Sequence, residues 1–155
     1  MTFRVSALQA EQFLKFSQMT NFELEQHGGQ RLTVDAKPGF PCRVSLKDAE
    51  IGETVLLLNF FHHDHNTPYR ASHAIFVREN ACQAKPFTNI IPDVIKSRLI
   101  SVRGFNAAHD MVTADVVGGN GLCGVINNFF DDGDIAYIHL HNAKQGCYAA
   151  RVDRA

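Results

Sequence analysis

Apolar and polar positions alternate along much of this chain, and a period of two residues predicts β-strands. The clearest alternating segments are rich in β-branched and aromatic residues and span residues 72–79, 98–105, 111–117, 135–141 and 147–153. The run TVLLLNFF, residues 54–61, is instead almost continuously apolar. Such a run is typical of a strand covered on both faces, so we expect it at the centre of a sheet.

A helical period appears near both ends of the chain. Apolar residues follow one stripe through residues 7–19, and Thr20 with Glu23 has the spacing of a capping box that opens a second short helix. Residues 121–130 place their apolar side chains at helical spacing once more. We therefore predict an α+β fold: one globular domain over residues 1–155, with a largely antiparallel sheet, two N-terminal helices, one late short helix and a C-terminal β-hairpin.

Charge and composition exclude several partner classes. The 155-residue chain has a net charge of -1, so it lacks the clustered positive charge that nucleic acids require. The longest purely apolar run, residues 55–58, is far shorter than the roughly 20 residues needed to span a bilayer. We expect neither nucleic acid nor membrane as a partner, and we expect a cytoplasmic protein. The four cysteines form no CxxC pair, which favours free thiols.

The stretch HLHNAKQGC, residues 139–147, contains the first candidate site. His139 and His141 share one face of the predicted strand, and a loop over residues 142–146 would pair His141 with Cys147 and His139 with Ala149. The expected apolar side of this hairpin consists of Ile138, Leu140, Tyr148, Ala150 and Val152. We therefore expect the histidine face to line a cleft or to face solvent.

Three functions fit this arrangement. In the first, Cys147 is a thiolate nucleophile with His139 or His141 as its base, so the protein is an enzyme or a small-molecule binding protein. In the second, a transition metal such as zinc is held by these histidines together with the cluster at residues 62–65, which contains three more. In the third, the protein binds a partner without chemistry of its own. Neither a cofactor nor the oligomeric state follows from the sequence.

Arginines in or beside the predicted strands suggest an anionic small molecule as ligand, because guanidinium groups match carboxylates and phosphates. These arginines are Arg43, Arg70, Arg78, Arg103 and Arg151. We predict ligand-binding roles for four of them and for one cysteine and one asparagine: Arg43, Arg70, Arg78, Arg151, Cys42 and Asn142.

Three segments resemble a family of short bacterial proteins known as Domain of Unknown Function 1203. They are PGFPCRVSLKDAEIGETVLLLNF, PYRASHAIFVRE and YIHLHNAKQGCYAARVDR, and they follow one another in the same order through most of the chain. The resemblance implies no known activity. It implies that the residues matching the family pattern are Cys42, Arg43, Tyr69, His139, Cys147 and Arg151.

The chain also departs from that family pattern. Ser45 and Ala150 stand where the resemblance would place the second thiol of each Cys-x-x-C, which argues against a four-thiolate zinc site. Arg78 stands in place of a family histidine and His141 in place of a family arginine. Because His139 matches the family pattern and His141 does not, His139 is the stronger candidate. We hypothesise further that an imidazole and a guanidinium have exchanged places in one shared site.

Overall fold

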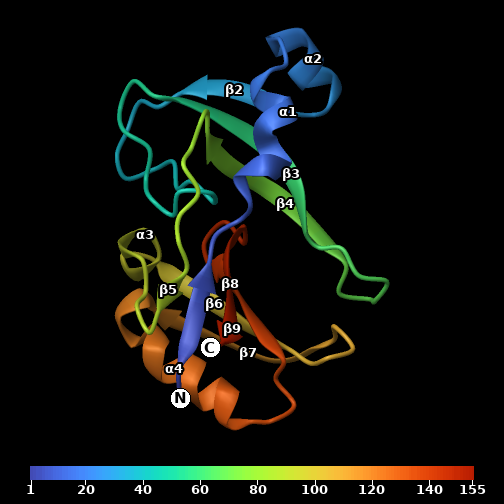
Figure 1. Ribbon diagram of the computed structural model, residues 1–155, viewed down its shortest axis with the longest axis vertical. Helices are drawn as coiled ribbons and strands as arrows, with labels where there is room; N and C mark the ends of the chain where they lie inside the picture. Colours follow the sequence, from blue (N-terminus) through green and yellow to red (C-terminus); the bar gives the residue numbers. More distant parts are fainter. The chain divides into compact units, whose positions relative to one another are not determined.

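The computed structural model describes all residues from 1 to 155, and the chain divides into two compact units (Figure 1). Unit 1 consists of Met1–Ser6, Phe61–His73 and Lys85–Ala155. Unit 2 consists of Ala7–Phe60 and Ala74–Ala84. The chain therefore passes between the units several times, and the prediction of one globular domain stays a prediction.

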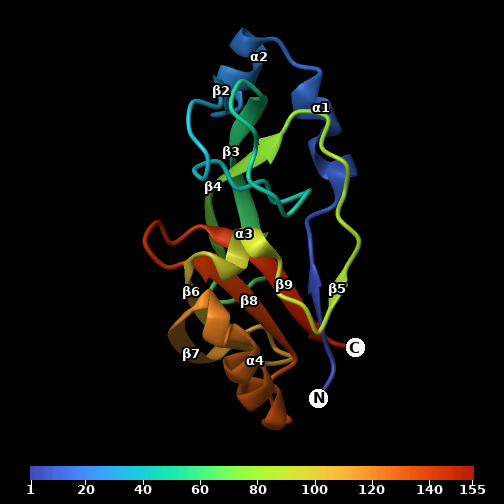
Figure 2. The same cartoon turned by 90° about the vertical axis from the view of Figure 1, so that its left-hand side faces the viewer.

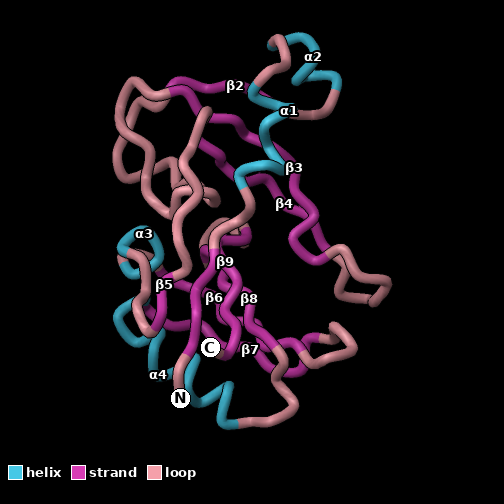
Figure 3. The backbone as a smooth tube through the Cα atoms, viewed as in Figure 1, coloured by secondary structure: helices cyan, strands magenta, loops and turns pink.

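Unit 1 is built on a six-stranded antiparallel sheet with the strand order β5-β1-β9-β8-β6-β7, coloured magenta in Figure 3. Its strands are β1 (Phe3–Ser6), β5 (Phe87–Thr88), β6 (Leu99–Phe105), β7 (Met111–Gly118), β8 (Tyr137–Asn142) and β9 (Tyr148–Arg154). The helices of this unit are α3 (Asp93–Lys96), a 3-10 turn η2 (Gly119–Gly121) and α4 (Leu122–Asp131). Figure 2 shows β1 beside β9 from a second direction.

One face of this sheet is apolar and packs against α4. Ile138, Leu140 and Val152 have no exposed surface. Gly104 on β6 lies so near the helix that an added Cβ would come 3.2 Å from the ring of Phe129 and 2.6 Å from Thr113 on β7. Burial of these aliphatic side chains supplies the hydrophobic stabilisation of unit 1, at roughly 25 cal/mol for each Å² of apolar surface removed from water.

The register of the β8-β9 hairpin differs from the predicted one. Asn142, not His141, lies opposite Cys147, because the Asn142 N–H donates to the Cys147 carbonyl over 2.9 Å. His141 pairs with Tyr148, and beyond it Leu140 pairs with Ala150. The strands thus contain a β-bulge in which Ala149 is the additional residue of β9.

The shorter turn and the bulge together change which side chains share a face. His139 pairs with Arg151 rather than with Ala149. Tyr148 lies on the histidine side, where its ring centroid is 5.8 Å from that of His141, so its predicted place on the apolar side was wrong. Ala150 and Val152 do pair with Leu140 and Ile138, as the alternation predicted.

Unit 2 combines a three-stranded sheet with the N-terminal helices. The sheet has the order β2-β3-β4, so the apolar run predicted to be central is central. Its strands are β2 (Gln30–Thr33), β3 (Thr54–His63) and β4 (Ala71–Arg78), of which the ends at 61–63 and 71–73 belong to unit 1. The helices are a 3-10 turn η1 (Ala10–Phe13), α1 (Leu14–Ser17) and α2 (Asn21–Gln26).

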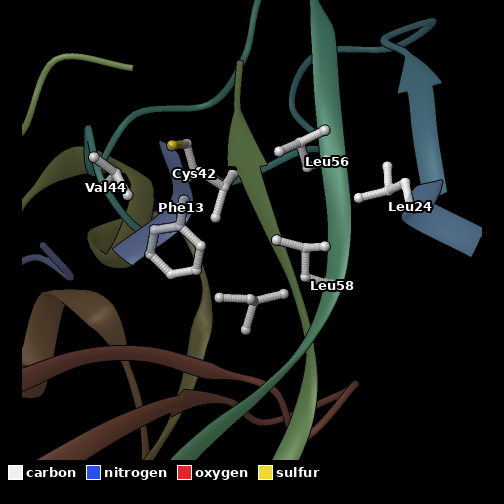
Figure 4. Packing of buried hydrophobic residues seen from close by; sticks show 8 residues of the cluster. Phe13, Leu24, Cys42, Val44, Leu56 and Leu58 are labelled. Atoms are coloured by element: carbon white, nitrogen blue, oxygen red, sulfur yellow. The ribbon is translucent and has the colours of Figure 1, made fainter. Parts of the chain in front are cut away.

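The core of unit 2 joins these helices to the sheet. Phe13, Leu24, Leu56 and Leu58 belong to one buried cluster that also includes Cys42 (Figure 4). The predicted capping box opens α2, since the Thr20 hydroxyl accepts from the Glu23 N–H and the Glu23 carboxylate accepts from the Thr20 N–H.

The predicted fold class is confirmed: the protein is α+β, its sheets are antiparallel, and the chain ends in a β-hairpin. The short strands β1 and β5 were not predicted, because segments of four and two residues carry too little alternation. None of the helices combines the length and the apolar character that crossing a bilayer requires.

Candidate functional site

The eight histidines are distributed unevenly, and all of them except His27 belong to unit 1. Several gather on the face of the six-stranded sheet opposite to α4. We call this surface the imidazole face and define it by residues of three strands: Arg103 and Phe105 of β6, Tyr137, His139 and His141 of β8, and Tyr148 and Arg151 of β9. These residues share a face because Arg103 pairs with His139 and Phe105 with Tyr137 across the β6-β8 ladder.

Two further histidines, at the end of β3, pack on the imidazole face. The ring centroid of His62 lies 4.7 Å from that of His141 and 6.2 Å from that of His139. The ring of His63 stacks on Phe105 at 4.5 Å and lies 5.7 Å from His139. The cluster at residues 62–65 and the hairpin histidines are thus neighbours within unit 1.

The histidines of the imidazole face are buried, which corrects the expectation that they line a cleft or face solvent. His139 is 3% exposed and His141 has no exposed surface. Both faces of β8 are therefore enclosed. Imidazoles are accommodated there because rings pack well against rings, as in the contact of His139 with Tyr148, whose centroids are 5.2 Å apart and nearly perpendicular.

Burial keeps these two imidazoles neutral. Desolvation lowers the pKa of His139 to about 2, with smaller contributions from His141, His62 and Arg151. Desolvation also lowers the pKa of His141 to about 3, and the next largest cause is the positive charge of Arg103. At neutral pH each ring therefore carries one N–H and one lone pair.

The hydrogen bonds of these rings are incomplete. The Nδ1–H of His141 donates to the carbonyl of Gly146 over 2.9 Å, which assigns the ring proton to Nδ1 and leaves a lone pair on Nε2. That Nε2 is buried without a hydrogen-bond partner, and so are Nδ1 of His139 and Nδ1 of His63. Buried polar atoms without partners are uncommon in folded proteins and require an explanation.

Tyr137 links two other histidines. Its hydroxyl lies 3.2 Å from Nε2 of His63 and 2.9 Å from Nδ1 of His109. His109 in turn stacks on His65, with ring centroids 3.5 Å apart and planes only 6° from parallel. Neither Tyr137 nor His109 was predicted as a site residue, because they become neighbours of His63 only when distant segments of the chain pack together.

Arg103 differs from the other arginines considered. Its Nε–H donates to the Ser101 hydroxyl over 3.2 Å, and the guanidinium has no carboxylate partner. Burial without a counter-charge lowers the pKa of this side chain. A half-buried cation without an anion is unfavourable, since the charge has lost hydration that nothing in the protein replaces.

The two predicted arginines of unit 1 already have carboxylates. Arg151 lies 2.8 Å from the carboxylate of Asp153 and 4.0 Å above the ring of Tyr137. Arg70 lies 2.7 Å from the carboxylate of Asp64 and stacks over Phe61 at 4.4 Å. A ligand anion would have to displace a protein carboxylate at either of them.

The predicted ligand-binding residues of unit 2 also have partners within the protein. Arg78 forms an ion pair with Glu53, which lowers the pKa of that carboxyl. Arg43 is buried and donates to the carbonyl of Pro41. The sulfur of Cys42 accepts from the backbone N–H of Arg78 over 3.2 Å, so these three residues help to hold unit 2 together. Their predicted ligand-binding roles stay predictions.

Cys147 and Asn142 form a contact of their own at the mouth of the hairpin. The Asn142 amide donates to the Cys147 sulfur over 3.4 Å, and both side chains are buried. The observed register pairs His141 with Tyr148, so the direct cross-strand pairing of His141 with Cys147 was wrong. A catalytic role for Cys147 with His139 or His141 stays a prediction.

The metal hypothesis requires three or four ligands that converge on one point. Residues 62–63 do lie beside His139 and His141. Even so, no group of three or more histidine, cysteine, aspartate or glutamate side chains is arranged so that it could hold a metal ion. A zinc-binding function therefore stays a prediction.

Comparison with known protein families identifies one that matches this chain. A family described as protein of unknown function (DUF1203) matches the chain over residues 39–154. No curated protein matches the chain, and no solved structure does. The matched range includes every residue of the imidazole face.

Proposed function

Since the chain belongs to the DUF1203 family of proteins of unknown function, we propose a function from its own side chains: unit 1 binds a small anionic molecule beside Arg103. The observation that carries this proposal is the guanidinium of Arg103, whose only hydrogen bond is the one to Ser101. Its desolvated charge is not balanced by any carboxylate of the protein. A carboxylate or phosphate group of a ligand would supply that missing charge.

The chemistry of the guanidinium favours these two groups. An arginine has five N–H donors in a planar fork, and Arg103 uses only Nε–H within the protein. The remaining four donors suit the paired oxygens of a carboxylate or a phosphate, which bind guanidinium in a bidentate manner. Charge-assisted hydrogen bonds of this kind contribute about 1.5–3 kcal/mol each.

The neighbouring imidazoles support the same ligand. His139 is the cross-strand partner of Arg103, and the charge of Arg103 acts on His141 strongly enough to lower its pKa. An anion bound to Arg103 would offset this repulsion and favour protonation of His141. Anion binding and the protonation of His141 are therefore coupled, and each stabilises the other.

The test is a titration of the protein with inorganic phosphate and, separately, with acetate at constant ionic strength and pH 6.5. We expect saturable nitrogen-15 shifts of the Arg103 Nε and the His141 ring nitrogens in the wild-type protein. Replacing Arg103→Gln removes the charge and should weaken binding about 10- to 100-fold, as expected for a charge-assisted contact.

The matched control is Arg4→Gln, which removes the charge of an exposed arginine on β1 of the same sheet. It should leave the affinity unchanged. Equal losses in both variants would mean that only the net charge matters, and the proposal would be wrong. It would be wrong as well if neither anion bound the wild-type protein at millimolar concentration, and a partner-binding protein without chemistry would then be the better hypothesis.

A further inference from the structure

Tyr137 places one hydroxyl between two imidazole nitrogens, and this arrangement restricts where protons can be. A phenol hydroxyl donates a single hydrogen bond and accepts others. With Nε2 of His63 at 3.2 Å and Nδ1 of His109 at 2.9 Å, Tyr137 can donate to only one of them. The other nitrogen must then carry its own proton and donate to the phenol oxygen.

Two proton arrangements satisfy these contacts. In the first, Tyr137 donates to His109, so His63 carries its proton on Nε2 and has a lone pair on Nδ1. In the second, Tyr137 donates to His63, whose proton is then on Nδ1, and His109 donates from its own Nδ1. The same heavy-atom distances serve both arrangements, and the protons alone distinguish them.

At the buried end of this hydrogen-bonded series, Nδ1 of His63 can offer either a lone pair or a proton. Nδ1 of His63 has no hydrogen-bond partner in the protein, and the residue is 1% exposed. The ring of His63 stacks on Phe105 and contacts His139, so Nδ1 belongs to the enclosed surroundings of the imidazole face. The other end is His109, which is only half-buried and stacks on the half-buried ring of His65.

We infer that His63, Tyr137 and His109 form a proton relay between a ligand on the imidazole face and the solvent. This inference rests on the proposed anion site for its ligand, but the relay itself is a property of the protein. The ligand class is a small carboxylate or phosphate that also carries a proton donor, such as a hydroxyl group. The relay would take up that proton while Arg103 holds the negative charge.

The transfer is balanced atom by atom. The ligand hydroxyl gives its proton to Nδ1 of His63, and the Nε2 proton of His63 passes to the oxygen of Tyr137. The original hydroxyl proton of Tyr137 passes to Nδ1 of His109, and the Nε2 proton of His109 leaves to water. One proton leaves the ligand and one enters water, with no redox change, and the return path restores the first arrangement.

The charges around the relay are mixed. Arg151 lies 4.0 Å above the Tyr137 ring and is paired with Asp153, so this neighbour brings a cation and an anion together. His65 faces His109, and His139 contacts both Tyr137 and His63. Burial raises the pKa of Tyr137 and lowers that of His63, so both are neutral at pH 7, as a relay of neutral groups requires.

The test uses the free protein without any anion, so it does not depend on the proposed ligand. Ring nitrogen-15 shifts of His63 and His109 are followed from pH 8 to pH 5 in the wild-type protein. We expect the nitrogen-15 shifts of the two rings to change together in one shared step, with the proton of His63 moving from Nε2 to Nδ1, because the rings are linked through the Tyr137 hydroxyl. Tyr137→Phe removes only the hydroxyl and should make the two rings titrate independently.

The control is Tyr69→Phe, which removes a phenol hydroxyl from an exposed residue of the same unit and should preserve the shared step. If Tyr137→Phe does not fold, His109→Gln serves instead, since it removes the outer ring and should leave the tautomer of His63 independent of pH between 8 and 5. Independent titration of the two rings in the wild-type protein would overturn the relay. A working relay in a protein that binds no phosphate or acetate would overturn only the proposed anion site.

Discussion

The two faces of strand β8 are both buried, but they differ in whether their side chains contain polar atoms without hydrogen-bond partners. On one face Ile138 and Leu140 pack against apolar neighbours and have no polar side-chain atoms. On the other face His139 and His141 are equally enclosed, yet each has a buried ring nitrogen without a hydrogen-bond partner. The first face stabilises the fold, whereas the second reduces stability by about 1–3 kcal/mol for each unsatisfied group. The proposed anion site and proton relay would both use residues of this imidazole face.

Lowering the pH should have the largest effect on the stability of the protein, because it favours protonation of the buried histidines of the imidazole face. The pKa values of His139 and His141 in the folded protein, about 2 and about 3, lie below the unfolded value of 6.5. Below pH 6.5 the unfolded chain therefore binds more protons, so stability is complete above that pH and falls as the pH falls. Two such residues predict a loss of roughly 4 kcal/mol between pH 7 and pH 5.

Urea denaturation at a series of pH values measures this loss. The double variant His139→Gln with His141→Gln removes both titrating rings and provides the control, because its stability should fall much less over the same range, with only His63 of the buried rings left to contribute. A wild-type protein equally stable at pH 7 and pH 5 would contradict neutral burial of these histidines.

Truncation of the apolar face should have the next largest effect. Leu140→Ala deletes buried methyl groups opposite Ala150, and we expect a loss of about 3 kcal/mol in the free energy of unfolding. Val116→Ala is the matched surface control, since this residue is 57% exposed, and it should cost less than about 0.5 kcal/mol. Similar losses in the two variants, measured by urea denaturation at pH 7, would show that the apolar face of β8 is not part of the core.

Replacing a buried side chain of the imidazole face should instead increase the free energy of unfolding. His139→Leu replaces a ring that has an unpartnered nitrogen with an apolar side chain, and we expect a gain of about 1 kcal/mol at pH 7. Thermal unfolding at pH 7 gives the sign directly. A loss as large as that of Leu140→Ala would mean that the ring of His139 contributes packing that leucine cannot replace, and the contrast between the two faces would fail.

The smallest expected effect concerns Arg103. Replacing Arg103→Met keeps the unbranched side chain and removes a desolvated charge, so we expect a small gain in stability, about 0.5 kcal/mol. The same variant should raise the pKa of His141, because the nearby positive charge that lowers it is gone. A lower pKa for His141 in this variant, measured by nitrogen-15 shifts, would contradict the proximity of the two groups.

The candidate site could be predicted only in part. The i, i+2 spacing of His139 and His141 correctly placed both rings on one face, because alternation is a local property of a strand. Cys147 was assigned to the same face by assuming a loop over residues 142–146, but the loop is one residue shorter and pairs Asn142 with Cys147. Arg103 was recognised as a strand residue, but its lack of a carboxylate depends on neighbours from other strands.

The sequence alone determined the α+β class, the central position of β3, the capping box of α2 and the alternation along β8, since each depends on residues close together in the chain. The tertiary structure decided the register of the hairpin, the burial of its histidines and the meeting of His63, Tyr137 and His109. The physical reason is that a strand's own sequence fixes which residues share a face, whereas turn geometry and long-range packing fix what each face meets.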